Sequence, residues 1–136
     1  MFLRKAFIIL TLSLLITGLY AQDHSSKVRI VDLENVATVI IQASTSSSEG
    51  ADDFPVYLDG VKQIKKFDDL YMILVRHDLK ASDPTIYICV ELIDMDDHSS
   101  IYEMAKYIRV SGAAESGPFS IKVKEINTME VMRKGY

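Results

Sequence analysis

The first 21 residues limit the part of this chain that can fold to the 115 residues after them. Arg4 and Lys5 precede an apolar run from Ala6 to Ile16, and the small residue Ala21 closes the segment. A charged start, an apolar stretch of this length and a small final residue are typical of a secretory signal. We therefore expect a signal peptide at 1–21, a mature chain that begins at Gln22, and a periplasmic or secreted location.

An uncleaved membrane anchor is the alternative for this segment. Leu19 is bulkier than the usual small residue two positions before a cleavage site, and the apolar run can continue through Tyr20. A membrane-spanning helix, however, needs ~20 predominantly apolar residues. Residues 6–21 are only 16 and include two threonines, a serine and a glycine. The length favours a signal peptide, so we expect no membrane contact after cleavage.

The charge balance indicates which partners the chain can bind. The whole chain has 15 Lys+Arg against 19 Asp+Glu and a formal net charge of -4. Removal of the signal takes away two cations and leaves a net charge of about −6. A negative surface repels phosphate backbones and anionic lipids. We therefore expect no nucleic acid, and a protein or envelope component as the partner. We also expect no cofactor.

The length and the cysteine content indicate one domain without an internal disulfide. We expect a single domain at 22–126, which is long enough to bury a core of its own. The only cysteine, Cys89, lies in the apolar run from Ile86 to Val90. We therefore expect a buried, inert thiol.

The first half of the mature chain predicts four strands. Weak alternation at 27–33 and β-branched residues at 36–43 predict two strands separated by the turn-prone pair Glu34-Asn35. A polar, flexible loop is expected at 44–53. Strands at 56–58 and 61–64 then flank Asp59-Gly60, which is a strong signal for a two-residue hairpin turn.

Two helices are predicted from the spacing of apolar residues. The first is capped by Asp68 and runs through about Lys80. The second has the capping-box pair Ser100 and Glu103, and Gly112 is placed for the left-handed residue beyond its end. The expected buried stripes are Leu70, Tyr71, Leu74, Val75 and Leu79 in the first helix and Ile101, Met104, Ala105 and Ile108 in the second.

The remaining segments complete the expected order of elements. The apolar run at 86–93 predicts a central strand covered on both faces. Residues 119–126 alternate and predict a strand near a sheet edge, and residues 127–136 are expected to be a C-terminal tail. No internal repeat is visible. The order predicts an α+β fold of two layers, a mixed β-sheet with two helices packed on one face.

Two groups of residues are candidates for a site. Asp94, Asp96, Asp97 and His98 follow the predicted central strand, and carboxylates with an imidazole can bind Mg²⁺, Mn²⁺ or Zn²⁺. Acidic residues are also common before a helix N-terminus, which explains the same cluster without a metal. The second group is Phe119, Ile121 and Val123, on an edge strand that can recruit a partner strand or a second copy to form a homodimer.

The order and spacing of these elements resemble the ExbD/TolR family of biopolymer transport proteins. The matching stretches are V-x-I-x-D-L at 28–33, VYLDG at 56–60, FDDL at 67–70, IYICVELID at 86–94 and RVSG at 109–112. The resemblance implies a periplasmic recognition domain with that family's fold. Residues 6–21 contain no acid, whereas the family's membrane helix carries a proton-binding one, so the proton-handling part is not implied here.

From these observations we expect an exported, non-enzymatic binding domain of the cell envelope. Two alternatives remain open. One is a small metal-dependent hydrolase that uses the acidic cluster at 94–98. The other is a stand-alone secreted α+β domain with a different role.

Overall fold

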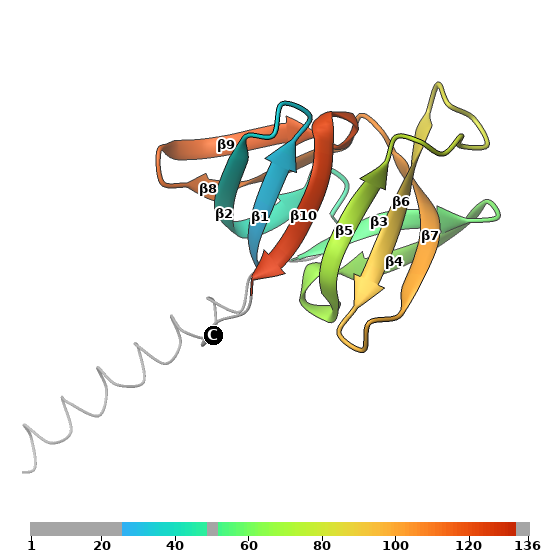
Figure 1. The fold of residues 1–136 in the computed structure, drawn as a ribbon, viewed down its shortest axis with the longest axis horizontal. Coiled ribbons are helices and arrows are strands. Elements are labelled where there is room, and N and C mark those ends of the chain that lie inside the picture. Colours follow the sequence, from blue (N-terminus) through green and yellow to red (C-terminus); the bar gives the residue numbers. More distant parts are fainter. Residues whose placement is uncertain (1–25, 49–51, 133–136) are drawn as a thin grey trace, which may run out of the picture.

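The chain forms one strongly curled antiparallel sheet of ten strands (Figure 1). The structure, a computed structural model, describes residues 26–48 and 52–132, so the expected signal peptide lies outside the described residues. The strands are β1 (Lys27–Asp32), β2 (Ala37–Thr45), β3 (Asp53–Leu58), β4 (Val61–Lys66), β5 (Leu70–Arg76), β6 (Tyr87–Asp94), β7 (Ser99–Ala105), β8 (Arg109–Ala114), β9 (Gly117–Lys122) and β10 (Ile126–Met132).

Helical structure in the described ranges is confined to two single 3₁₀ turns. These are η1 (Phe67–Asp69), before β5, and η2 (Val123–Glu125), before β10. No helix there is long and apolar enough to cross a membrane. The strand order across the sheet is β4-β3-β7-β6-β5-β10-β1-β2-β8-β9.

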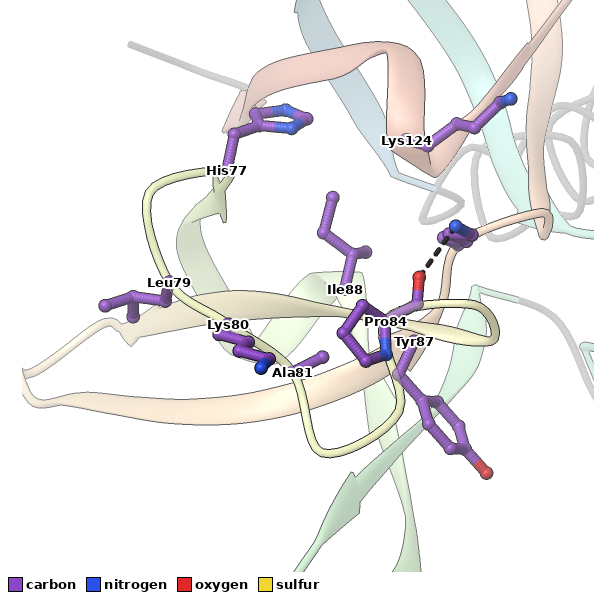
Figure 2. A pocket seen from close by; sticks show the side chains of 9 residues that line it. His77, Leu79, Lys80, Ala81, Pro84, Tyr87, Ile88 and Lys124 are labelled. Carbon is purple, nitrogen blue, oxygen red and sulfur yellow. Dashed lines mark hydrogen bonds between the residues drawn. The ribbon is translucent and has the colours of Figure 1, made fainter.

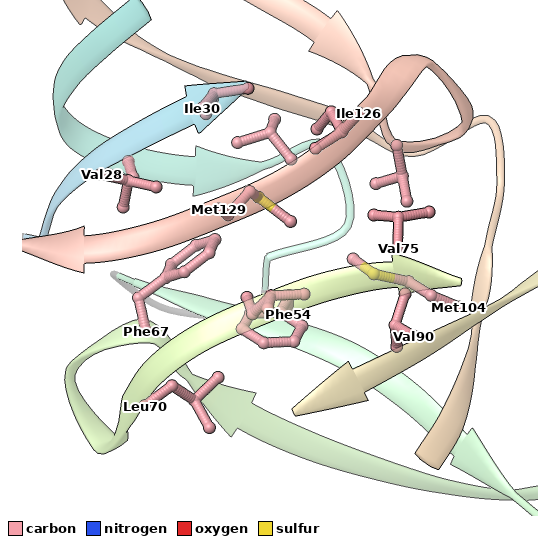
Figure 3. Packing of buried hydrophobic residues seen from close by; sticks show 14 of the residues in the cluster. Val28, Ile30, Phe54, Phe67, Leu70, Val75, Val90, Met104, Ile126 and Met129 are labelled. Carbon is pink, nitrogen blue, oxygen red and sulfur yellow. The ribbon is translucent and has the colours of Figure 1, made fainter. Parts of the chain in front are cut away.

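The inner face of the curled sheet encloses one hydrophobic core (Figure 3). The rings of Phe54 and Phe67 pack with their centroids 4.8 Å apart and are fully buried. Ile73 of β5 and Met129 of β10 are also fully buried and lie opposite each other in the sheet. The core therefore continues without interruption across the middle of the sheet.

The predicted α+β fold is wrong, because both predicted helices are strands. Residues 70–76 form β5, and its inward residues Leu70, Ile73 and Val75 are buried while Met72 and Leu74 are half-buried on the other face. A strand that is apolar on both faces also satisfies three- and four-residue spacings, which explains the false helical pattern. Residues 99–105 and 109–114 form β7 and β8, and Gly112 lies within β8.

Five predicted strands are confirmed in position, whereas the C-terminal tail predicted at 127–136 is wrong for its described part. β1, β2, the hairpin of β3 and β4, and β6 lie where the pattern placed them. Asp59 and Gly60 both have positive φ, 51° and 80°, as the two-residue hairpin requires. β9 lies at one end of the sheet, as expected of an edge strand, but the strand predicted at 119–126 is too long, because β9 ends at Lys122 and residues 123–125 form η2. Residues 127–132, expected as a tail, belong to the central strand β10.

The two halves of the sheet repeat one arrangement that the sequence does not reveal. Outward from the central pair of β5 and β10, the order is β6-β7-β3-β4 on one side and β1-β2-β8-β9 on the other. η1 and η2 occupy corresponding places. Equivalent residues also pair in the same register. In the first half Ile73 pairs with Leu92 and Val75 with Val90, and in the second half Met129 pairs with Ile30 and Val131 with Val28. A pseudo-twofold axis therefore passes through the pair Ile73 and Met129.

The two halves differ in how the chain runs through them. The first half is continuous from β3 to β7. The second consists of β8 to β10 and is completed by β1 and β2, because Lys27 pairs with Met132 and brings the two ends of the described chain together (Figure 1). The loop at 77–86 joins β5 to β6 in the first half, and its counterpart in the second half is the gap between β10 and β1.

Candidate functional site

The acidic cluster lies in the turn between β6 and β7 rather than before a helix. Ligand atoms of Asp94, Asp96 and His98 lie within 4.8 Å of one another, whereas Asp97 is outside this group. The His98 side chain is 81% exposed. Asp94 Oδ1 accepts hydrogen bonds from the backbone N–H groups of Asp96 and His98, each at 2.9 Å. The carboxylate is thus already used to close the turn.

The pseudo-twofold partner of this turn shows that the arrangement is structural. Asp32 Oδ1 accepts from the N–H groups of Glu34 and Val36, at 2.8 and 3.0 Å, in the same pattern. Asn35 (φ 63°) matches Asp97 (φ 65°) as the residue with positive φ. In the turn at 32–36, Val36 takes the place of His98, and its side chain cannot bind a metal. The same carboxylate hydrogen bonds therefore form in a turn that has no imidazole ligand. The geometry alone does not make the 94–98 turn a metal centre.

The three predicted partner-binding residues on the edge strand face inward. Val123 is fully buried, Ile121 is 9% exposed and Phe119 packs against the core. Val123 begins η2, and its N–H donates to Ile108 O at 2.9 Å. Because hydrogen bonding alternates along an antiparallel pair, the intervening residues Pro118, Ser120 and Lys122 direct their backbone groups away from β8. The outer edge of β9 is thus formed by these three residues.

A group of cations surrounds Tyr107 beside this edge. The Nζ atoms of Lys124, Lys106 and Lys122 lie 4.9, 5.3 and 5.8 Å from the centroid of its ring, which is 55% exposed. Lys122 lies directly opposite Arg109 of β8, whose Nε donates to Ser120 Oγ at 2.8 Å. We call Tyr107, its three lysines and Arg109 the basic patch. It is a concentration of positive charge on a chain of net charge -4.

Next to the basic patch, the loop at 77–86 borders an open pocket of about 250 Å³ (Figure 2). We call it the lysine pocket, and Lys106 and Lys124 belong to both features. In Figure 2, His77 and Lys124 lie on opposite sides of its upper rim, with Ile88 between them. The lining residues are His77, Leu79, Lys80, Ala81, Pro84, Tyr87, Ile88, Lys106 and Lys124. None of them is acidic.

Hydrogen bonds hold the loop that forms the pocket. His77 Nε2 donates to Ile126 O at 2.7 Å, because a carbonyl oxygen can only accept. Lys106 Nζ donates to Pro84 O at 2.7 Å (Figure 2). Ser82 Oγ donates to Glu103 at 2.6 Å. These bonds tie both ends of the loop and its middle to the sheet, so the pocket is built before any ligand arrives.

Two other groups have shifted pKa values for reasons that concern stability rather than chemistry. Burial raises the pKa of the Cys89 thiol, and the side chain is 6% exposed, which agrees with the expected buried and unreactive cysteine. Burial also raises the pKa of the Asp52 carboxyl, although the hydrogen bond from Ser26 N–H opposes this shift.

Sequence reasoning missed the basic patch and the lysine pocket. Lys106 and Tyr107 were expected within a helix, and Lys122 and Lys124 were expected on a separate strand, so nothing in the pattern brought them together. The chain matches no protein-family model, and no curated protein shows significant similarity to it. The two helices on which the resemblance to ExbD/TolR partly rested are strands here, and the family relationship itself stays a prediction.

Proposed function

We propose that this chain is an exported, non-enzymatic binding domain of the cell envelope that recognises an acidic, extended segment of a partner protein along β9. The observation that carries the proposal is the basic patch, which lies directly against an edge strand. Three ammonium groups lie within 5.8 Å of one ring centroid. Their separations are thus comparable to one Debye length at 0.1 M salt, ~10 Å, so their fields add at the surface. An anionic segment is attracted to such a surface, and a cationic one is repelled.

The edge of β9 favours a peptide over other anionic partners. Ser120 and Lys122 direct both a donor and an acceptor outward, and Pro118 directs an acceptor only. No other described strand pairs with this edge. An extended peptide that adds to a sheet gains main-chain hydrogen bonds, and its alternate side chains then meet the patch. Proline and lysine also discourage indiscriminate edge pairing, which restricts binding to a segment of the right charge.

The test uses a fluorescent ten-residue peptide of alternating Glu and Val, measured by anisotropy against the purified chain. We expect Lys122→Glu to weaken binding ten-fold or more, equivalent to ~1.4 kcal/mol. The matched control is Lys66→Glu, since Lys66 is the pseudo-twofold equivalent of Lys122 on the other edge strand, and it should leave affinity within two-fold.

Two results would contradict the proposal. Equal loss in the Lys66 and Lys122 variants would mean that only net charge matters. Equal affinity for a backbone N-methylated peptide would show that strand pairing makes no contribution. Circular dichroism of each variant checks that the sheet is intact before any binding result is interpreted.

A further inference from the structure

We infer that the lysine pocket is a second site, which shares Lys106 and Lys124 with the basic patch and binds a small amphipathic anion: a carboxylate or phosphate group carried on a short apolar body. The site goes beyond strand addition at β9, because it lies on the inner side of Lys106 and Lys124, under the loop at 77–86. The inference depends on the lining and on the preformed loop.

The lining divides into a cationic part and an apolar part. Lys80, Lys106 and Lys124 line the pocket from three different segments, together with His77. The apolar wall consists of Leu79, Ala81, Pro84 and Ile88. Two acids on the loop offset part of this charge, although each has its own hydrogen-bond partner. Asp78 pairs with Arg76 at 2.8 Å and also attracts His77, and Asp83 accepts from Thr85 Oγ1 at 2.6 Å and also attracts Lys106. A ligand with one anionic end and one apolar end satisfies both parts.

The pocket depends on the loop at 77–86, which joins β5 to β6. Hydrogen bonds to Ile126, Glu103 and Lys106 hold this loop over the sheet. A preformed cavity avoids the cost of ordering a loop when the ligand binds.

The volume limits the size of the ligand. The cavity of about 250 Å³ is below the ~300–1,000 Å³ usual for ligand pockets. It suits a short apolar body, such as an eight-carbon chain or a single aromatic ring, together with its charged group. Octanoate and phenyl phosphate are therefore suitable probes.

The experiment is a titration of the full chain followed by ¹H–¹⁵N NMR, which reports both affinity and location. We expect octanoate and phenyl phosphate to shift the amides of 77–88, 106 and 124. Octanol, octylamine and inorganic phosphate each lack one of the two required features, and they should bind at least ten-fold more weakly. Lys80→Gln, which changes the pocket but not the basic patch, should weaken octanoate three-fold or more. Lys122→Gln, which changes the patch but not the pocket, should have less than a two-fold effect.

Each contrary result would overturn the inference. If octanol binds as tightly as octanoate, the lysines do not recognise charge. If inorganic phosphate binds as tightly as phenyl phosphate, the apolar wall has no role. Equal effects of Lys80→Gln and Lys122→Gln would place the anion on the basic patch instead. The acidic-peptide assay on Lys80→Gln separates the two sites, because this variant should bind that peptide normally.

Discussion

Asp94 offers a direct test of whether the acidic cluster is a metal site or a turn. The two interpretations differ in what Asp94→Asn should do. An asparagine keeps a side-chain oxygen that accepts from the backbone, and it also favours turns, so the turn should survive. A metal site would lose a charged ligand. We expect Asp94→Asn to change the free energy of unfolding by less than ~0.5 kcal/mol, as ordinary surface substitutions do.

The corresponding alanine variants give the magnitude of the turn's contribution. Asp94→Ala removes the acceptor of two backbone hydrogen bonds at 2.9 Å. A comparable loss, that of a capping side chain at a helix start, costs about 0.5–2 kcal/mol. We therefore expect a loss of ~1–2 kcal/mol, which lowers Tm by roughly 3–10 °C in a domain of this size. Asp32→Ala should cost the same, because its turn makes the same bonds.

The assay is a thermal melt of each variant in EDTA and then with Mg²⁺, Mn²⁺, Ca²⁺ or Zn²⁺. A metal at ~100 times its dissociation constant would raise stability by about 2.7 kcal/mol. We expect no such rise in the natural chain. A metal-dependent rise that disappears in Asp94→Asn, but persists in Asp32→Asn, would refute the structural interpretation and restore the hydrolase alternative.

Two further predictions concern stability. Burial raises the folded-state pKa of Asp52, so ionisation of this carboxyl weakens the fold as pH rises through that pKa. Asp52→Asn keeps an acceptor for Ser26 N–H. This variant should therefore be more stable than the natural chain between pH 4 and 7 and not at pH 3. Urea unfolding across this range measures the effect, and a difference that is constant with pH would contradict it. Gly112→Ala should lower the free energy of unfolding by about 1–3 kcal/mol. A Cβ at this position would lie 2.7 Å from Ile41 O and 3.0 Å from Ile40 Cβ. An unchanged urea midpoint would contradict this, because it would mean that β2 and β8 move apart easily.

Local patterns in the sequence predicted most strands but not the fold class. Asp59-Gly60 and the turn at Glu34-Asn35 were recognised because their chemistry is local. The equivalent turn at 94–98 was interpreted as the approach to a helix, since Ser100 and Glu103 match a capping box. In the structure Glu103 instead accepts hydrogen bonds from Ser82, a tertiary contact that no local pattern specifies.

The candidate sites depended even more on tertiary structure. Some positions related by the pseudo-twofold axis have the same residue type, such as Val28 and Val90, or Asp32 and Asp94. Most share only their burial, as Leu70 and Ile126 do. The first half is continuous in the sequence, whereas the second half combines β8–β10 with β1 and β2, so a search along the chain does not find the repeat. Lys80, Lys106 and Lys124 come together only through the curl of the sheet and the loop at 77–86.

The position of β10 has a consequence for the order in which the protein can fold. β10 is the last of the described strands to be synthesised, yet it lies at the centre of the sheet and joins β5 to β1, the first of them. The hairpin of β1 and β2 and the hairpin of β8 and β9 therefore have no strand pairing with the first half until β10 is present. Such pairing between distant segments is slow to form. The continuous half, β3 to β7, can assemble from local contacts, whereas the complete sheet must wait for β10.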